Sequence, residues 1–197
     1  ALSNWRAKRA SAASPSVRTA SMIGFTFSSK LERSDSVRCS SRLRSAIDVE
    51  LGWAMTRGAQ TRLVDGLHRH CASQEGNAIS AACRLGFGDD PRLPELVGRL
   101  GGWQWPDGGW NCDKRPEATH SSFHESLAPL RGLVDYRSVS GRGDLDDVIA
   151  AAAEMFLRAG LFRTLGRREV LHPSFLRLRY PPYWHYNILA GLVVLTD

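Results

Sequence analysis

The sequence contains few cysteines, and those present follow no pattern. Four of its 197 residues are cysteine, without regular spacing and without a CxxC pair (Cys39, Cys71, Cys83 and Cys112). This low density argues against a disulfide framework, on which a chain of this length does not depend. We therefore expect a protein of a reducing compartment.

Long hydrophobic runs are also missing. No segment approaches the roughly 20 apolar residues that a membrane-spanning helix requires, and there is no signal-peptide hydrophobic region. No stretch alternates apolar and polar residues long enough to predict a sheet. Ser/His/Asp triads, phosphate-binding loops and nucleotide-binding fingerprints are absent as recognisable motifs, so none of these classes is indicated.

Acidic residues are scarce in the first 45 residues. This segment holds nine Lys and Arg residues against Glu32 and Asp35, a net charge of +7. Because the whole chain carries +6, residues 46–197 carry a net charge of −1. The basic charge therefore belongs to the N-terminal segment, and we expect no nucleic acid as a partner of the folded part.

The same N-terminal segment holds twelve serines. An Arg-rich, Ser-rich and acid-poor composition describes an organelle transit peptide, and equally a tail that cannot bury enough apolar surface to become ordered. We expect residues 1–45 to form a disordered tail and residues 46–197 to form the folded domain. The expected location is the cytoplasm, with import into an organelle as the alternative.

Helical periodicity dominates from residue 46 onward. Asp90 and Pro91 are suited to begin a helix, and four apolar residues at helical spacing follow them (Leu93, Leu96, Val97 and Leu100). Further helical segments are predicted at five places (residues 47–55, residues 62–70, and segments beginning at Thr119, near Asp144 and after Pro182). The predicted fold class is all-α.

Parts of the chain resemble each other at a spacing of roughly 55–60 residues, which is typical of a helical-hairpin repeat. Gly88-Asp89 precedes one predicted helix as Gly143-Asp144 precedes another, and Phe123-His124 corresponds to Trp184-His185. Each unit of such a repeat needs neighbouring units to complete its core.

The two ends of the chain indicate a piece of a longer protein. The chain begins with Ala1 rather than Met, and residues 189–195 form an apolar run without a helix cap. A helix interrupted in this way lacks part of its packing partner. We expect an incomplete repeat domain whose last helix exposes an apolar face, which missing repeats or a partner chain would cover.

Residues 101–113 combine three tryptophans with several glycines. Each tryptophan has a large apolar body and an indole N–H that needs an acceptor, so a solvated loop is an unfavourable place for it. The turn signal in residues 106–109 lets the chain reverse direction. We expect this loop to fold back on the ends of neighbouring helices and to hold them in place.

Gln104, Gly108 and Trp110 match the QxxxGxW core of the QW repeat, although Arg99 occupies the upstream aromatic position. On these residues, and on the order of helix, loop and helix around them, residues 73–197 resemble squalene and oxidosqualene cyclases and the β subunits of protein prenyltransferases. The resemblance implies an α/α-toroid, here a partial barrel of helical hairpins. Its substrate cavity would open at the N-terminal ends of the inner helices, mapped to residues 117–125 and 180–186.

Residues 144–147 read Asp-Leu-Asp-Asp, a literal match to the DxDD motif with which class II terpene cyclases protonate an alkene. In the cyclases this motif begins an inner helix after a Gly/Trp loop, a place taken here by residues 118–120. Acidic residues in the first turn of an outer helix instead favour the helix dipole. We expect these aspartates to start a helix rather than to act as acids.

The resemblance and the residue types together suggest five catalytic candidates (Asp113, His120, His124, Glu125 and His185). His120 and His124 share one helix face at a spacing that suits a metal ion. Protein prenyltransferases bind zinc through Asp, Cys and His, so Cys112, His120 and His124 are the candidate zinc ligands. The family's Asp-x-Cys pair is not reproduced, and histidines that line a polar cavity or satisfy helix ends are the alternative.

Aromatic residues near the same helix ends are candidates to line a cavity for an isoprenoid or other lipid-like molecule (Phe123, Tyr180, Tyr183, Trp184 and Tyr186). Aromatics at helical spacing also serve simply as core. Two function classes stay open. One is an enzyme of the terpene cyclase or prenyltransferase type, whose catalytic candidates must face one cavity. The other is a non-catalytic helical-repeat module that binds a lipid-like ligand or a protein partner.

Overall fold

The computed structural model describes residues 41–57, 62–164, 167–179, 181, 183 and 185–197. All of them belong to one compact unit, Arg33–Asp197. The predicted tail up to residue 40 lies outside the described residues, and so do the candidate cavity residues Tyr180 and Trp184.

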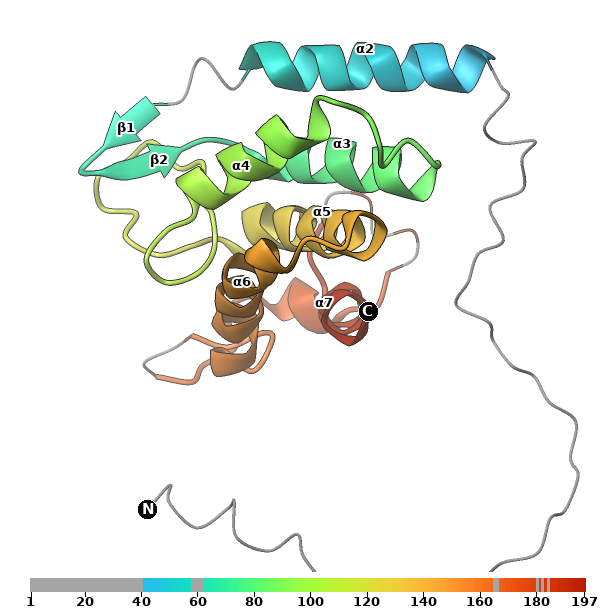
Figure 1. The fold of residues 1–197 in the computed structure, drawn as a ribbon. Helices are drawn as coiled ribbons and strands as arrows, with labels where there is room; N and C mark the ends of the chain where they lie inside the picture. The colour runs from blue at the N-terminus through green and yellow to red at the C-terminus, as the bar shows by residue number, and fades with distance from the viewer. Residues whose placement is uncertain (1–40, 58–61, 165–166, 180, 182, 184) are drawn as a thin grey trace, which may run out of the picture. The chain divides into compact units, whose positions relative to one another are not determined.

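The described part of the chain is mostly helical, as predicted, with one small hairpin (Figure 1). Its elements in chain order are α2 (Ser41–Arg57), β1 (Arg62–Val64), β2 (Leu67–Arg69), α3 (Ala72–Arg84), α4 (Leu93–Trp103), α5 (Phe123–Ser140), the 3₁₀ helix η2 (Gly143–Leu145), α6 (Asp146–Arg158), the 3₁₀ helix η3 (Pro173–Leu176) and α7 (Ile188–Thr196).

Helices α3 and α5 form the most extensive contact of the fold. Gly76 of α3 lies so close to α5 that a Cβ atom there would be 2.4 Å from the backbone carbonyl carbon of Ala128. A Cβ atom on Gly132 of α5 would in turn be 2.5 Å from the carbonyl oxygen of Gly76. The two glycines thus bring two backbones into contact. Around this pair, α2 and α4 pack on α3, while α6 and α7 pack on α5 (Figure 1).

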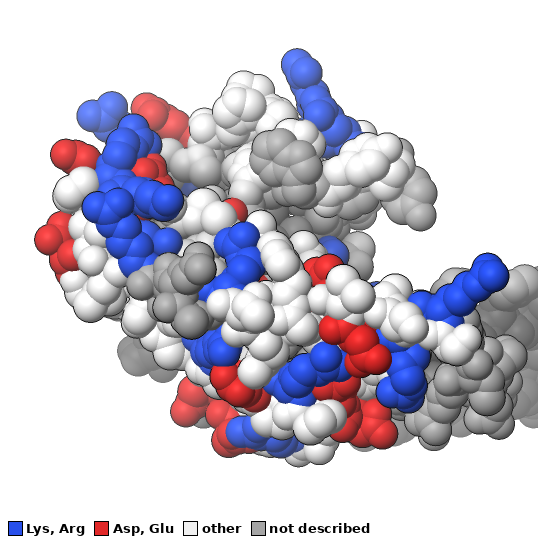
Figure 2. All heavy atoms as spheres, turned by 90° about the horizontal axis from the view of Figure 1, so that it is seen from above, with Lys and Arg blue, Asp and Glu red and all other residues white. Residues whose placement is uncertain are grey.

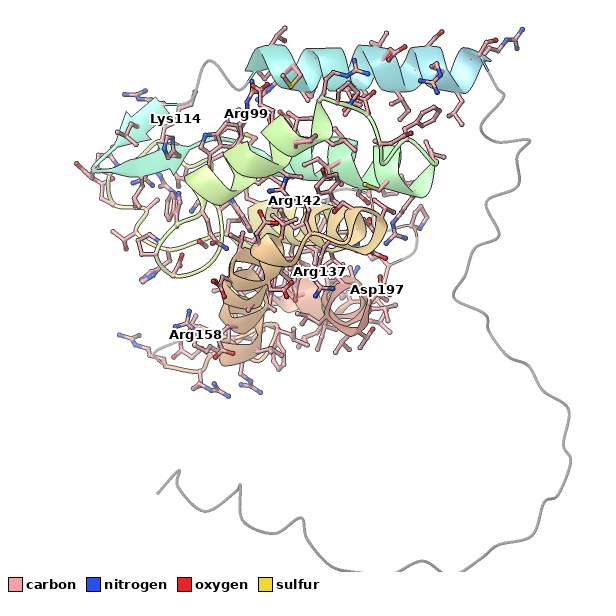
Figure 3. All side chains as sticks on the ribbon, in the orientation of Figure 1. Arg99, Lys114, Arg137, Arg142, Arg158 and Asp197 are labelled. Atoms are coloured by element: carbon pink, nitrogen blue, oxygen red, sulfur yellow. The ribbon has the colours of Figure 1, made fainter. Side chains whose placement is uncertain are left out.

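Helix α2 is attached through one apolar side and through an arginine of α4. Its buried residues are spaced along one face (Ile47, Leu51 and Ala54). Arg99 extends from α4 toward the C-terminal end of α2 (Figure 3) and donates hydrogen bonds to the carbonyl oxygens of Ala54 and Met55 at 3.3 and 2.9 Å. These carbonyls lie in the last turn of α2, where intrahelical donors run out and a cation is favourable.

The start of α2 and the segment after it correct two predictions. Residues 41–45 are helical, so the tail predicted over residues 1–45 is wrong at its C-terminal end. The helix predicted over residues 62–70 is also wrong, because β1 and β2 form an antiparallel hairpin there. Asp65 and Gly66 make its turn with φ angles of 51° and 76°. Asp-Gly is the sequence that a two-residue hairpin turn with positive φ angles prefers.

The other predicted helices are present, with later starts. Helix α5 begins at Phe123 instead of Thr119, because the side chain of Ser122 caps it. Helix α7 begins at Ile188, where the Asn187 side chain accepts a hydrogen bond from the backbone N–H of Ala190 at 2.9 Å. Ser and Asn are preferred N-caps because their side-chain oxygens satisfy unpaired N–H groups of the first turn.

The aspartates of residues 144–147 start a helix, as predicted. Asp144 lies in η2, and Asp146 lies in the first turn of α6. Both are exposed and ion-paired, Asp144 with Arg142 and Asp146 with Arg137. Each arginine lowers the pKa of its partner carboxyl below the usual range. A carboxyl group that protonates a substrate needs a raised pKa, so neither aspartate is suited to that role.

The tryptophans of the loop after α4 are buried, as predicted; Trp110 holds a helix end, whereas Trp105 contacts a strand. The Trp110 indole N–H donates to the carbonyl oxygen of Leu100 near the end of α4, at 2.9 Å. The Trp105 indole N–H donates to the carbonyl oxygen of His68 in β2, also at 2.9 Å. Each large ring is thus buried together with a satisfied polar group.

Gln104 and Gly108 connect the same loop to α6. The Gln104 side-chain amide donates to the carbonyl oxygens of Gly108 and Val148, at 2.8 and 2.9 Å. Gly108 has a φ of 102°, and a Cβ atom on it would be 2.2 Å from the carbonyl oxygen of Ala151. The residues that match the QW repeat therefore have a structural role in this protein.

Helix α7 has an apolar face that is exposed to solvent. Three apolar residues of this helix (Leu189, Leu192 and Val193) are each between 44% and 48% exposed, which confirms the predicted exposed apolar face.

Within the described residues, no helix has both the length and the apolar character needed to cross a membrane. On the face shown in Figure 2, acidic and basic side chains lie next to one another instead of forming a patch of one sign.

Candidate functional site

A cleft of about 630 Å³ lies where the N-terminal ends of α5 and α7 approach η3. Its lining includes the N-cap residues of both helices, Ser122 and Asn187. The N-terminus of a helix carries partial positive charge and favours an anion. The volume falls within the range of roughly 300–1,000 Å³ that is typical of small-molecule sites.

Basic side chains dominate the polar lining of this cleft. Two arginines and three histidines contribute to it (Arg177, Arg179, His124, His172 and His185), and none of its described lining residues is acidic. The two arginines and His172 were not among the site residues predicted from the sequence. The signal was present, because residues 163–179 contain five arginines and one glutamate, but the net charge of −1 over residues 46–197 concealed it.

Aromatic side chains form an apolar wall beside these basic residues. Phe175 and Tyr186 line the cleft with ring centroids 4.8 Å apart, and both are buried. Phe123 packs behind them in the core, 5.0 Å from Tyr186 between centroids. The Tyr186 hydroxyl donates to the carbonyl oxygen of Leu161 at 2.8 Å, and burial raises its pKa well above the usual value. Tyr186 therefore contributes shape and apolar surface, and stays neutral.

His124 and His185 both line the cleft, with ring centroids 6.2 Å apart in an edge-on arrangement. Burial lowers the pKa of His124 below 6.5, and the positive charges of His185 and His172 lower it further against the opposing effect of Glu125. The His124 ring also packs against Phe175 at 5.4 Å between centroids. Its environment therefore favours the neutral imidazole.

A second cavity, of about 200 Å³, is lined by the same two histidines. Three of the five catalytic candidates line it, His124, Glu125 and His185, together with the cavity candidate Tyr183. Asp113 and His120 line neither cavity. Asp113 is paired with Arg115 at 2.6 Å, which holds the pKa of Asp113 at about 2, and His120 is exposed. The structure thus brings together three of the five candidates.

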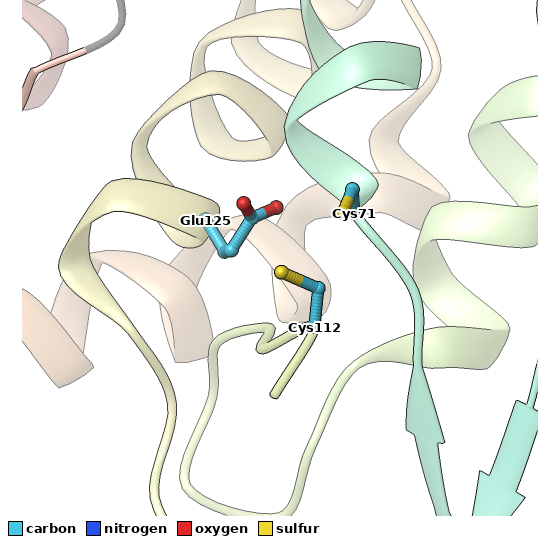
Figure 4. Close-up of side chains that lie close together, drawn as sticks. All are labelled: Cys71, Cys112 and Glu125. Carbon is cyan, nitrogen blue, oxygen red and sulfur yellow. The ribbon is translucent and has the colours of Figure 1, made fainter. Parts of the chain in front are cut away.

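Cys112 lies with Cys71 and Glu125 instead of with His120 and His124 (Figure 4). Their two sulfur atoms and a carboxylate oxygen are all within 4.8 Å of one another. Among the residues that the structure describes, no other three His, Cys, Asp or Glu side chains converge in this way. The predicted ligand set Cys112, His120 and His124 is therefore not assembled.

The environment of Cys112 opposes its ionisation. Burial raises the pKa of the Cys112 thiol to about 12, and the Glu125 carboxylate and the hydrogen bond with Cys71 act in the same direction. A reactive cysteine needs a lowered pKa, because the thiolate is the nucleophile. Cys112 is thus not set up as a nucleophile by these side chains.

No protein-family model, curated protein or solved structure matches this chain. The resemblance of residues 73–197 to the cyclases and prenyltransferases accordingly depends on the QxxxGxW residues and the order of the elements around them.

Proposed function

We propose that this protein binds a polyprenyl or similar lipid-like molecule with an anionic head group in the cleft between α5, η3 and α7. The composition of the cleft is the observation that carries the proposal: five basic side chains, no acidic one among the described lining residues, and an aromatic wall. Arginine is well suited to pair with phosphate groups, and aromatic rings offer apolar surface to a hydrocarbon chain.

The position of the cleft supports the same proposal. In the family that residues 73–197 resemble, the substrate cavity opens at the N-terminal ends of the inner helices. In the proposed α/α-toroid arrangement, α5 and α7 are inner helices, and α4 and α6 are outer ones. The N-caps Ser122 and Asn187 both border the cleft, so two helix dipoles add to its preference for an anion.

Binding without catalysis is the function that the geometry supports best. Asp113 and His120 lie away from both cavities, and Asp144 and Asp146 are paired with arginines on the surface. An enzyme of the cyclase or prenyltransferase type is the second candidate. It is favoured by the three catalytic candidates that share the smaller cavity.

Farnesyl diphosphate is expected to bind the purified chain. Farnesol, which lacks the anionic head group, and inorganic diphosphate, which lacks the hydrocarbon chain, should each bind more weakly. Replacing both exposed arginines, R177Q with R179Q, is expected to weaken farnesyl diphosphate binding about ten-fold. Each exposed ion pair contributes up to about 1 kcal/mol, and ten-fold corresponds to about 1.4 kcal/mol. Isothermal titration calorimetry measures all of these affinities.

The control is a second double variant, R137Q with R142Q, which also removes two arginines, an exposed one at the C-terminal end of α5 and a half-buried one just before η2 (Figure 3). Both of these arginines are paired with surface aspartates, away from the cleft. Its affinity should equal that of the unchanged chain. Equal weakening by both double variants would indicate nonspecific charge attraction and contradict the proposed site. Product analysis of the same mixtures by mass spectrometry separates the two candidates, since only an enzyme consumes the ligand.

A further inference from the structure

Cys71 and Cys112 are brought together by a backbone contact between segments far apart in the sequence. Strand β2 ends at Arg69, which forms a parallel bridge with Asn111. Both segments continue in the same direction beyond the bridge, and the sulfur atoms of Cys71 and Cys112, two residues and one residue past it, lie within 4.8 Å of each other. The Arg69 guanidinium also donates to the carbonyl oxygen of Ala118 at 2.6 Å, which ties the loop to β2. The two thiols are thus held by an ordered scaffold.

Glu125 reaches the same place from the first turn of α5. Its carboxylate accepts a hydrogen bond from the backbone N–H of Ser73 at 3.3 Å, in the first turn of α3. Cys71 immediately precedes α3, so the carboxylate lies beside its thiol. Capping α3 is one role for Glu125, favoured by the helix dipole. Capping does not account for the two adjacent thiols.

We infer that Cys71, Cys112 and Glu125 bind a zinc ion (Figure 4). Cysteine sulfur and carboxylate oxygen are both zinc ligands, with bonds of about 2.3 and 2.1 Å, which place tetrahedral ligand atoms roughly 3.5–3.8 Å apart. The ligand atoms here are already within 4.8 Å of one another. Side-chain torsions alone can close a difference of about 1 Å. Three protein ligands leave the fourth position to water or to an added ligand.

The burial of the cluster gives a cation a further role. All three side chains are partly buried, and each carries negative charge when deprotonated. Partly buried charges of one sign are unfavourable unless they are paired. One divalent cation is a partner for all three groups at once. The inference does not depend on the proposed ligand, because it uses none of the arginines or histidines of the cleft.

The full chain, purified under reducing conditions and extensively desalted, is expected to hold about one zinc ion by elemental analysis. After chelation it should take up zinc again by titration, and thermal unfolding should shift to higher temperature with zinc. Replacing zinc with cobalt should produce a thiolate-to-cobalt charge-transfer band. C71A and C112A are each expected to weaken zinc binding at least about 100-fold and to lose that band, since losing even an outer-shell partner costs 10- to 100-fold.

C83A is the matched control, because Cys83 lies in the core, away from the cluster, and zinc binding should be unchanged. E125Q tests the site without removing a cysteine, because glutamine keeps an acceptor for the Ser73 N–H while losing the charge; about ten-fold weaker binding is expected. This variant decides the question if C112A does not fold.

Three results would overturn the inference. The first is a reduced, folded chain that takes up no zinc. The second is zinc binding that survives unchanged in a C71A/C112A double variant, which would place the metal elsewhere. The third is a Cys71–Cys112 disulfide, found by thiol titration and peptide mapping, in a chain that binds no zinc after reduction.

Discussion

Replacing Gly76 with alanine is expected to lower the free energy of unfolding by about 3 kcal/mol or more. The added Cβ atom would be 2.4 Å from the carbonyl carbon of Ala128 and from the nitrogen of Pro129. These are backbone atoms of α5, so no side-chain rotation relieves the overlap. Overpacking usually costs about 1–3 kcal/mol, and it costs more where backbones must separate. The contact concerned is the most extensive one in the fold.

Gly98 provides the matched control for this substitution. It lies inside α4, and a Cβ atom there would meet nothing within 4 Å. G98A is therefore expected to raise the free energy of unfolding by about 0.5–1 kcal/mol, since alanine favours a helix more than glycine does. Urea unfolding followed by circular dichroism measures both variants. If G76A and G98A changed stability in the same direction, α3 and α5 would not pack as closely as described.

The same close packing explains why α3 could not be predicted from the sequence. Its buried side consists mainly of small or polar residues (Ala72, Glu75, Gly76, Ala78, Ile79, Ser80, Ala82 and Cys83). Hydrophobic periodicity is recognised from large apolar residues, and only Ile79 is both large and apolar in this set. The stability of α3 comes from its close approach to α5, which is a tertiary property. By contrast, α4 and α6 bury large apolar residues at helical spacing and were predictable.

Neither the hairpin nor the cysteine cluster was predicted from the sequence, and the reasons differ. The hairpin carries a local signal, the Asp65-Gly66 turn, which outweighs the apolar residues around it. The cluster has no local signal. Cys71 and Cys112 meet because Arg69 and Asn111 form a bridge between segments about forty residues apart, and neither residue type predicts such a contact. Metal-ligand spacing is informative only when the ligands lie close in the sequence.

The sequence predicted the position of the cleft but only some of the residues that line it. The expectation that polar and aromatic side chains meet at the N-terminal ends of two helices agrees with the positions of His124, His185 and Tyr186. The two arginines and His172 come from the segment around η3, which lies between helices and has no helical periodicity. Averaging charge over the whole domain removed the evidence for them. Charge counted over short segments is the more informative quantity for such sites.

Replacing Trp110 with alanine is expected to cost about 3–5 kcal/mol, because its ring is only 1% exposed and would leave a large cavity. Its polar contacts join two helices. The indole N–H donates to Leu100 in the last turn of α4, and its carbonyl oxygen accepts from the backbone N–H of the α5 cap, Ser122, at 2.9 Å. W110F should cost less, about 1–3 kcal/mol, since it keeps most of the ring but leaves the Leu100 carbonyl without this donor.

Trp53 is the control for Trp110, because it is a tryptophan that is not buried. It is 41% exposed on α2, where the guanidinium carbon of Arg57 lies 4.8 Å from its ring. W53A is expected to cost less than about 1 kcal/mol. Urea unfolding should therefore rank the variants W110A, W110F and W53A in order of decreasing cost. If W110A cost no more than W53A, the loop after α4 would not hold α4 and α5 together.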